Sequence, residues 1–164
     1  MSESHQRLSV HEVDPAATEA VLALERYVRS SGLDHQLYEL VKIRASQLNG
    51  CAYCLDMHTR DAREGGEDQR RLDVLSAWRE APSLFTERER AALAFTEAVT
   101  LIADDGVPDQ VWAEVTGCFS HQEAVHLLMA VAAINVWNRL AVATHQALPE
   151  IDRSQAARSQ PANA

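Results

Sequence analysis

The sequence of 164 residues is poor in the residues that form the turns of β-rich folds, with 6 glycines and 5 prolines. A sandwich or barrel of many short strands needs frequent turns, so this scarcity argues against such a fold. No window shows a sustained alternation of apolar and polar residues, which is the pattern of a half-buried strand. The periodic segments that remain fit helices, and the sequence therefore predicts an all-α protein.

Positive charge is also in short supply, because 15 Lys and Arg residues stand against 24 Asp and Glu residues, for a formal net charge of −9. The sequence has no basic stripe that could displace counterions from phosphates, which argues against a nucleic-acid partner. An acidic balance favours small substrates that are neutral or cationic, and it keeps a protein soluble.

Long apolar segments are missing as well. The longest run, around residues 127–134, is too short to span a bilayer, and residues 1–15 are polar, without the apolar centre of a signal peptide. We therefore expect a cytoplasmic protein with no membrane partner. In that compartment closely spaced cysteines more often serve redox chemistry or metal binding than a structural disulfide.

The length suits one domain with a hydrophobic core. We expect a flexible arm over residues 1–15, a helical domain over residues 16–147 and a disordered tail over residues 148–164. The domain's helices are predicted over residues 16–29, 34–48, 51–63, 67–78, 86–102, 108–118 and 120–147. The last is apolar nearly all round, so we expect it to be buried, either centrally or between subunits. Its polar residues then need partners, and these are Asn135, Asn138 and Arg139.

Cysteine is rare, with three copies, but two of them, Cys51 and Cys54, lie close to His58. On a helix, offsets of 0, 3 and 7 fall on one stripe, so both sulfurs and the imidazole would point the same way. Two thiols and a titratable base on one face form either a redox dithiol or a set of metal ligands.

The redox interpretation requires a thiolate, because only the ionised sulfur attacks a peroxide. A thiol in the first turn of a helix meets unpaired N–H groups that favour negative charge, which points to Cys51 as the attacking sulfur. His58 lies four residues beyond Cys54 and can accept its proton, which points to Cys54. The second thiol can capture a sulfenate as a disulfide, and the residues alone leave the two roles open.

Glu39 is a further candidate, on the helix that precedes the two cysteines. The Asn49-Gly50 connection folds the two helices back on each other, so the Glu39 carboxylate could approach the imidazole of His58. A partly buried carboxylate beside a thiol and an imidazole can act as a proton acceptor.

A zinc site is the main alternative, with Cys51, Cys54 and His58 as three ligands and Cys118 or His121 as the fourth. Structural zinc sites usually draw paired ligands from two knuckles, and the sequence has no second pair, which favours the redox interpretation. A third possibility is that the two cysteines are merely small residues in a helix contact. We expect Cys118 to be a packing residue and His126 to be a hydrogen-bonded histidine of the core or of an interface.

The pattern Glu-x11-Cys-x-x-Cys-x3-His over residues 39–58, together with residues 133–140, resembles the AhpD-like alkylhydroperoxidases of the carboxymuconolactone decarboxylase family. The resemblance covers roughly residues 16–147. It implies an all-helical bundle, with helical hairpins around a buried C-terminal helix, that assembles into a homo-oligomer, a trimer or a hexamer.

The resemblance also implies roles for the residues of the motif. Cys54 would be the peroxidatic cysteine and Cys51 the resolving one, while Glu39 and His58 would form the proton relay. Tyr53, which takes the place of a relay histidine in the best-studied AhpD enzymes, is expected just behind these groups.

The implied activity is that of a thiol-dependent peroxidase that reduces organic hydroperoxides or hydrogen peroxide and needs no metal or other cofactor. An external dithiol, lipoyl-bearing in AhpD itself, would reduce the resulting disulfide. The alternatives are a general thiol-disulfide oxidoreductase and a non-enzymatic zinc-binding module. The lactone decarboxylase chemistry of the wider family does not need a dithiol.

Overall fold

The computed structural model describes residues 6–149, and within this range it contains helices and no strand, which confirms the all-α prediction. In chain order the elements are α1 (Val10–Val13), α2 (Pro15–Ser30), α3 (His35–Asn49), α4 (Ala52–Glu64), α5 (Gln69–Val74), the 3-10 helices η1 (Leu75–Glu80) and η2 (Pro82–Leu84), α6 (Glu87–Thr100), α7 (Ile102–Asp105), α8 (Asp109–Cys118) and α9 (His121–Thr144).

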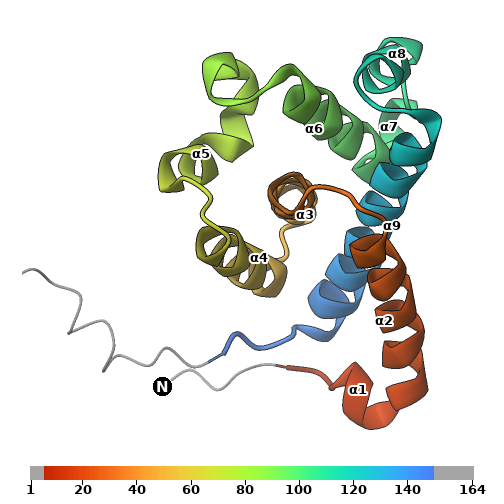
Figure 1. The fold of residues 1–164 in the computed structure, drawn as a ribbon. Coiled ribbons are helices and arrows are strands. Elements are labelled where there is room, and N and C mark those ends of the chain that lie inside the picture. Colours follow the sequence, from red (N-terminus) through yellow and green to blue (C-terminus); the bar gives the residue numbers. More distant parts are fainter. Residues whose placement is uncertain (1–5, 150–164) are drawn as a thin grey trace, which may run out of the picture.

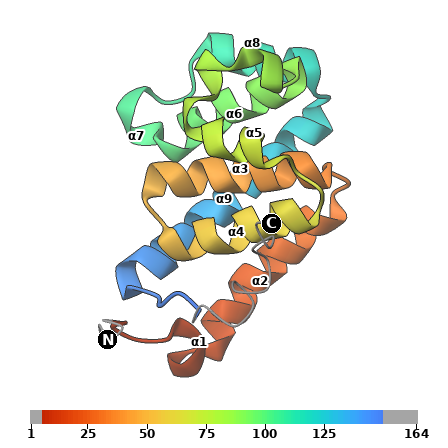
Figure 2. The same cartoon turned by 90° about the vertical axis from the view of Figure 1, so that its left-hand side faces the viewer.

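Helix α3 occupies the centre of the bundle. Figure 1 shows it end-on, with α4, α5, α6, α9 and α2 arranged around it, and in Figure 2 it runs between α4 on one side and α6 on the other. Its two apolar faces pack into two hydrophobic clusters. In the first, Val41 packs with residues of α6, α8 and α9. In the second, Leu40 and Ile43 pack with residues of α4, α5, η1 and α6. The central helix is therefore the one that carries Glu39.

The C-terminal helix α9 begins as the sequence predicts, with a capping box in which Ser120 and Glu123 satisfy each other's backbone N–H groups. One face, with Leu127, Val131 and Ile134, is fully buried. Of the two placements expected for this helix, central or between subunits, complete burial within the single chain is not found, because its opposite face stays exposed. The exposed apolar residues on that face are Val125, Leu128, Val136 and Val142.

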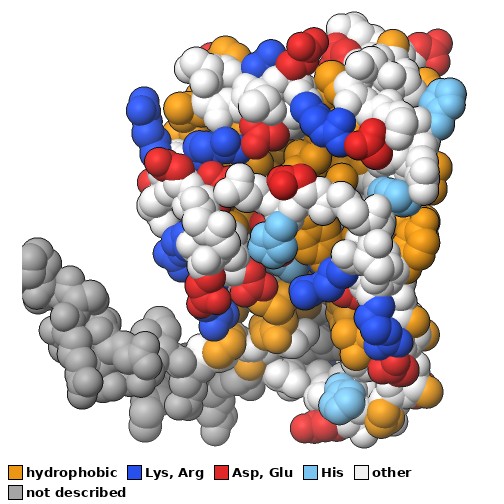
Figure 3. All heavy atoms as spheres, viewed as in Figure 1, with side chains coloured by type: hydrophobic (Ala, Val, Ile, Leu, Met, Phe, Trp, Pro, Cys, Tyr) orange, Lys and Arg blue, Asp and Glu red, His pale blue; other side chains and the backbone are white. Residues whose placement is uncertain are grey.

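By length and composition alone α9 could cross a membrane, although the central helices of many soluble proteins pass the same test. In this fold α9 packs along α2, α3 and α6. Figure 3 shows Lys and Arg side chains interspersed with Asp and Glu on the face that Figure 1 presents, so the charge on that face is mixed.

Residues 6–15, expected to be a flexible arm, instead contain α1 and contacts with the end of α9. The backbone N–H of Arg7 donates to the carbonyl of Thr144 at 2.8 Å. Asp14 caps α2, and its side chain accepts from the backbone N–H groups of the next turn. These contacts hold residues 6–15 in place. The polar sequence of this segment does not predict them, because they depend on where α9 ends. The tail expected over residues 148–164 lies, from residue 150 onward, outside the described residues.

Two predicted helices are shorter than expected. The segment over residues 67–78 divides into α5 and the 3-10 helix η1, and within η1 Ala77 departs from helical geometry. The helix that begins at Thr86 ends at Thr100, where Leu101 turns the chain before α7.

A tight turn links α3 to α4 and sets the position of the cysteines. Gly50 ends α3 in the left-handed conformation, with φ of 64°, which a residue with a side chain adopts only at a cost. The backbone N–H of Cys51 then donates to the carbonyl of Ser46 at 3.0 Å. This geometry folds α4 back along α3 and leaves Cys51 at the start of α4.

Candidate active site

Cys51 is the N-cap of α4 rather than its first helical residue. Its Sγ accepts the backbone N–H of Cys54 at 3.3 Å, in the way that a serine or aspartate oxygen caps a helix. Both cysteines are free thiols and are 1% exposed. The sequence predicts both cysteines within one helix, whereas in the structure Cys51 lies at the end of α4 and only Cys54 lies inside it.

The two thiols are electrostatically unequal. The hydrogen bond from the Cys54 thiol lowers the pKa of Cys51 to about 6, against the opposing effect of burial, and backbone N–H groups of Cys54 and Tyr53 together with the Asn138 side chain act in the same direction. The same hydrogen bond raises the pKa of Cys54, and burial and the charge of Cys51 raise it further. The pair therefore ionises more readily at Cys51 than at Cys54, and the proton that remains is held by Cys54.

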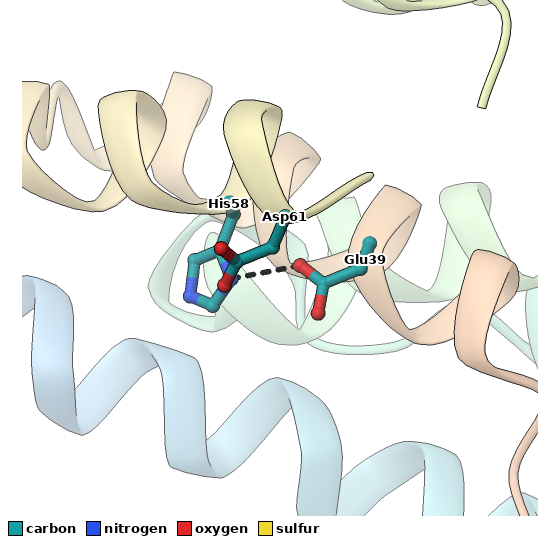
Figure 4. A group of neighbouring side chains, drawn as sticks. All are labelled: Glu39, His58 and Asp61. Carbon is teal, nitrogen blue, oxygen red and sulfur yellow. Dashed lines mark hydrogen bonds and ion pairs between the residues drawn. The ribbon is translucent and has the colours of Figure 1, made fainter. Parts of the chain in front are cut away.

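His58 and Glu39 lie against each other in the core. Nδ1 of His58 is 2.8 Å from Oε2 of Glu39, as Figure 4 shows, and both side chains are almost completely buried. The predicted approach of Glu39 from α3 to His58 on α4 is thus present. With Glu39 accepting at Nδ1, the tautomer that donates there leaves Nε2 as an acceptor. Nε2 is buried and has no hydrogen-bond partner among residues 6–149.

Two further groups surround this pair. The carboxylate of Asp61, one turn along α4 from His58, stands beside the imidazole in Figure 4, and its ligand atoms lie within 4.8 Å of those of Glu39 and His58. Nε2 of the exposed His35 is 3.8 Å from Oε1 of Glu39. The spacing of His35 and Asp61 gave no signal that they would gather here, because that depends on how α3 and α4 pack.

A cavity of about 260 Å³ brings Cys54 and His58 to one surface. Tyr53, expected just behind these groups, also lines this cavity. Cys51 lies outside the described lining and borders a separate shallow hollow instead. The remaining lining residues are Leu22, Glu25, Arg29, Lys42, Met57, Trp137, Ala141 and Gln146. Of the two sulfurs, Cys54 is therefore the one that a molecule in this cavity would meet.

The polar residues of α9 find their partners at the end of α3. Asn138, which is buried, donates to Oγ of Ser46 at 3.0 Å and accepts from Nδ2 of Asn49 at 2.8 Å. Asn135 accepts from Nδ2 of Asn49 at 3.0 Å and receives a hydrogen bond from Arg139. The partners that these residues were expected to need are thus found, for Asn135 and Asn138, at the end of α3. Their connection to the thiols through Asn138 was not foreseen.

The zinc ligand set suggested by the sequence does not assemble. Among the described residues, the group of three metal-ligating side chains with atoms within 4.8 Å of one another is Glu39, His58 and Asp61, without either cysteine. Cys118 packs against the cluster of α6, α8 and α9, as expected for a packing residue, and His121 begins α9. His126 is half-buried, with its ring edge-on to Tyr27 at 6.2 Å between centroids.

The fold and the motif define a helical bundle with a buried dithiol at a helix start. The family model described as "Carboxymuconolactone decarboxylase family" matches residues 15–98. The uncharacterized protein YdfG of Bacillus subtilis is 39% identical over 138 residues, which cover 84% of this chain and 93% of YdfG. The chain belongs to the carboxymuconolactone decarboxylase family, which confirms the resemblance seen in the sequence.

Solved structures agree with this assignment. A protein of unknown function from Agrobacterium tumefaciens, proposed to be the antioxidant defence protein AhpD, is 43% identical and superposes with a TM-score of 0.86 over 89% of this chain and 99% of that one. An uncharacterized peroxidase-related protein from Silicibacter shares the fold at 23% identity, with a TM-score of 0.68 over 77% of this chain and 67% of its own. The AhpD-like fold is therefore shown.

Proposed function

We propose that this protein is a thiol-dependent peroxidase that reduces organic hydroperoxides or hydrogen peroxide with the Cys51–Cys54 dithiol. The observation that carries the proposal is the position of Cys54, which shares a cavity with the unpartnered Nε2 of His58 and lies next to the acidic thiol of Cys51. A nucleophile and a proton carrier thus share one cavity, and the second thiol lies next to the nucleophile, outside the cavity lining.

The first step is attack on the peroxide. His58 takes the first proton of the dithiol, and Glu39 stabilises the resulting imidazolium through Nδ1. The proton that remains on the pair crosses from Cys54 to Cys51, which places the negative charge on the sulfur in the cavity. The Cys54 thiolate attacks the terminal oxygen of ROOH, the O–O bond breaks, and Cys54 becomes a sulfenic acid. The departing alkoxide takes the proton from His58 and leaves as ROH.

The second step closes the disulfide. The neutral His58 accepts the proton of Cys51, and the Cys51 thiolate attacks the sulfur of the Cys54 sulfenic acid. Hydroxide leaves and takes the proton from His58, so the products are a disulfide and water. The low pKa of Cys51 supports this role, because a thiol that ionises easily is ready when the sulfenic acid forms. An external dithiol, of which a lipoyl group is one candidate, then reduces the disulfide.

The assembly proposed is a homo-oligomer, a trimer or a hexamer, in the cytoplasm. Val125, Leu128, Val136 and Val142 share one face of α9 and are exposed in the single chain, which supports a contact between copies. Light scattering on the purified protein tests this, and a monomer at micromolar concentration would contradict it.

A general thiol-disulfide oxidoreductase is the second candidate, because a Cys-x-x-Cys thiol with a pKa of about 6 also suits disulfide exchange. Burial of both sulfurs argues against a protein disulfide as substrate. The two activities separate when turnover on cumene hydroperoxide is compared with reduction of a model disulfide.

Thiol titration tests the peroxidase directly. The chain has three cysteines, and one equivalent of hydroperoxide should remove two thiols, leaving Cys118. A dithiol reductant should restore both. A thiol count that does not change after the peroxide would overturn the proposal, and stoichiometric zinc in freshly purified protein would favour the zinc-binding module instead.

A further inference from the structure

Glu25, on α2, has an unusual division of hydrogen bonds between its two carboxylate oxygens. Oε1 accepts from the Tyr38 hydroxyl, from Nζ of Lys42 and, at 3.4 Å, from Nε of Arg29. Oε2 is buried and has no partner among residues 6–149. Glu25 is 8% exposed and lines the cavity of Cys54 and His58. A bare carboxylate oxygen at this position leaves a strong acceptor unsatisfied.

Two residues of the cavity lining therefore carry a buried atom without a hydrogen-bond partner among residues 6–149, Nε2 of His58 and Oε2 of Glu25. His58 is accounted for by the proposed peroxide chemistry, but Glu25 is not. A ligand that satisfied both would offer a hydrogen-bond donor to Oε2 at one end and, at the other, a polar group to Nε2, which accepts when the imidazole is neutral and donates when it is protonated.

The charged residues around Glu25 determine which kind of hydrogen-bond donor suits Oε2. Lys42 is 1% exposed, with Nζ held by Glu25 and 4.1 Å from the centroid of the Tyr38 ring. Lys42 and Arg29 already balance the negative charge of Glu25, and the carboxylate of Glu39 also acts on Lys42. Oε2 therefore needs a hydrogen-bond donor and no further charge, so the donor that suits it is neutral, a hydroxyl or an N–H group.

The rest of the lining limits the size and polarity of the ligand. Leu22, Met57, Trp137 and Ala141 supply apolar surface. A volume of about 260 Å³ corresponds to roughly nine water molecules, so the cavity suits a compact ligand with an apolar middle.

We propose that the substrate is a compact, neutral organic hydroperoxide that carries a second hydrogen-bond donor, a hydroxyl or N–H group, and that Oε2 of Glu25 accepts from this donor. The proposal rests on the proposed function for the peroxide end, which meets Cys54 and His58. It makes Glu25 the specificity-determining residue and Lys42 the group that fixes its orientation.

The first experiment compares alkyl hydroperoxides of matched length with and without a terminal hydroxyl, in a series that moves the hydroxyl stepwise away from the peroxide. One hydroxylated member should have a kcat/KM at least about tenfold above its plain counterpart, because a hydrogen bond to a charged group is worth that much. Equal values across the whole series would overturn the proposal.

The second experiment needs no turnover. Calorimetric titration of the reduced protein with diols and matched mono-alcohols should show the best diol binding about tenfold more tightly. Glu25→Gln should abolish that difference, and Glu19→Gln, an exposed position on the same helix, should keep it. If Glu25→Gln fails to fold, Glu25→Gln combined with Lys42→Met removes both buried charges together.

The two proposals fail in different ways. A diol preference in a protein that reduces no peroxide would sink the peroxidase and leave the donor specificity of the cavity standing. Peroxide reduction without any preference in turnover or binding would leave the peroxidase standing and overturn the role of Glu25.

Discussion

Nδ1 of His58 and Oε2 of Glu39 are 2.8 Å apart, and this bond fixes the imidazole between two surroundings. On one side is a buried carboxylate from the central helix, and on the other is the cavity that Cys54 lines. Because Nδ1 is hydrogen-bonded to Glu39, a proton that the imidazole accepts or donates has to be transferred at Nε2.

Substitution of the relay should reduce peroxidase activity in graded steps. His58→Gln removes the proton carrier, and kcat/KM should fall by about 10²–10⁴-fold. Glu39→Gln keeps an acceptor at Nδ1 but loses the negative charge that stabilises the imidazolium, so a smaller loss is expected, about tenfold to a hundredfold. Steady-state kinetics with cumene hydroperoxide measure both.

Asp61→Asn is the matched control, because Asp61 stands beside the imidazole while the hydrogen bond of the relay joins His58 to Glu39. Its kcat/KM should change by less than about threefold. A loss as large as that of His58→Gln would move the proton acceptor from Glu39 to Asp61.

The two cysteines should differ sharply under substitution. Cys54→Ser should abolish turnover, since the remaining thiol lies outside the described lining of the cavity. Cys51→Ser should allow one oxidation per chain and then stop, with a sulfenic acid on Cys54 that mass spectrometry detects. Full multi-turnover activity in both variants would contradict the assignment of peroxidatic and resolving roles.

The ionisation of the dithiol should follow the lowered pKa of Cys51. The thiolate absorbance in the ultraviolet should rise as the pH passes about 6, because the neutral form dominates below that value and the thiolate above it. In Cys54→Ala the main hydrogen-bond donor to Cys51 is gone while burial persists, so the inflection should move to higher pH. An unchanged inflection would mean that the backbone N–H groups alone hold the charge.

The sequence was sufficient for the helical class and the capping box of α9, because both depend on spacing. For the approach of Glu39 to His58 the short Asn49-Gly50 turn gave an indication, and the family resemblance implied the pairing. The sequence was not sufficient for the position of α3 at the centre, since apolarity all round α9 made that helix the better candidate. The roles of Glu25 and Lys42 were missed for a related reason. A glutamate or lysine in a helix is usually solvated, and only the packing of α2 on α3 and α9 buries this pair.

Asn138 should prove important for both stability and chemistry. Asn138→Ala leaves Oγ of Ser46 without its donor and removes one of the acceptors of Asn49, so the free energy of unfolding should fall by about 1–3 kcal/mol in urea titration. The same change removes a hydrogen bond that lowers the pKa of Cys51, and the thiolate inflection should rise. Gln122→Ala, at an exposed position of the same helix, is the control and should change neither quantity.

The cap that Cys51 places on α4 ties the oxidation state of the dithiol to the local order of the helix. In the reduced protein the sulfur of Cys51 accepts the backbone N–H of Cys54 and carries negative charge at the helix start. A disulfide bond to Cys54 neutralises that sulfur, and the first turn of α4 loses its charged acceptor. Amide protons of this turn should then exchange faster with solvent in the oxidised protein than in the reduced one. A reducing partner would therefore meet a first turn of α4 that is less ordered than in the reduced protein.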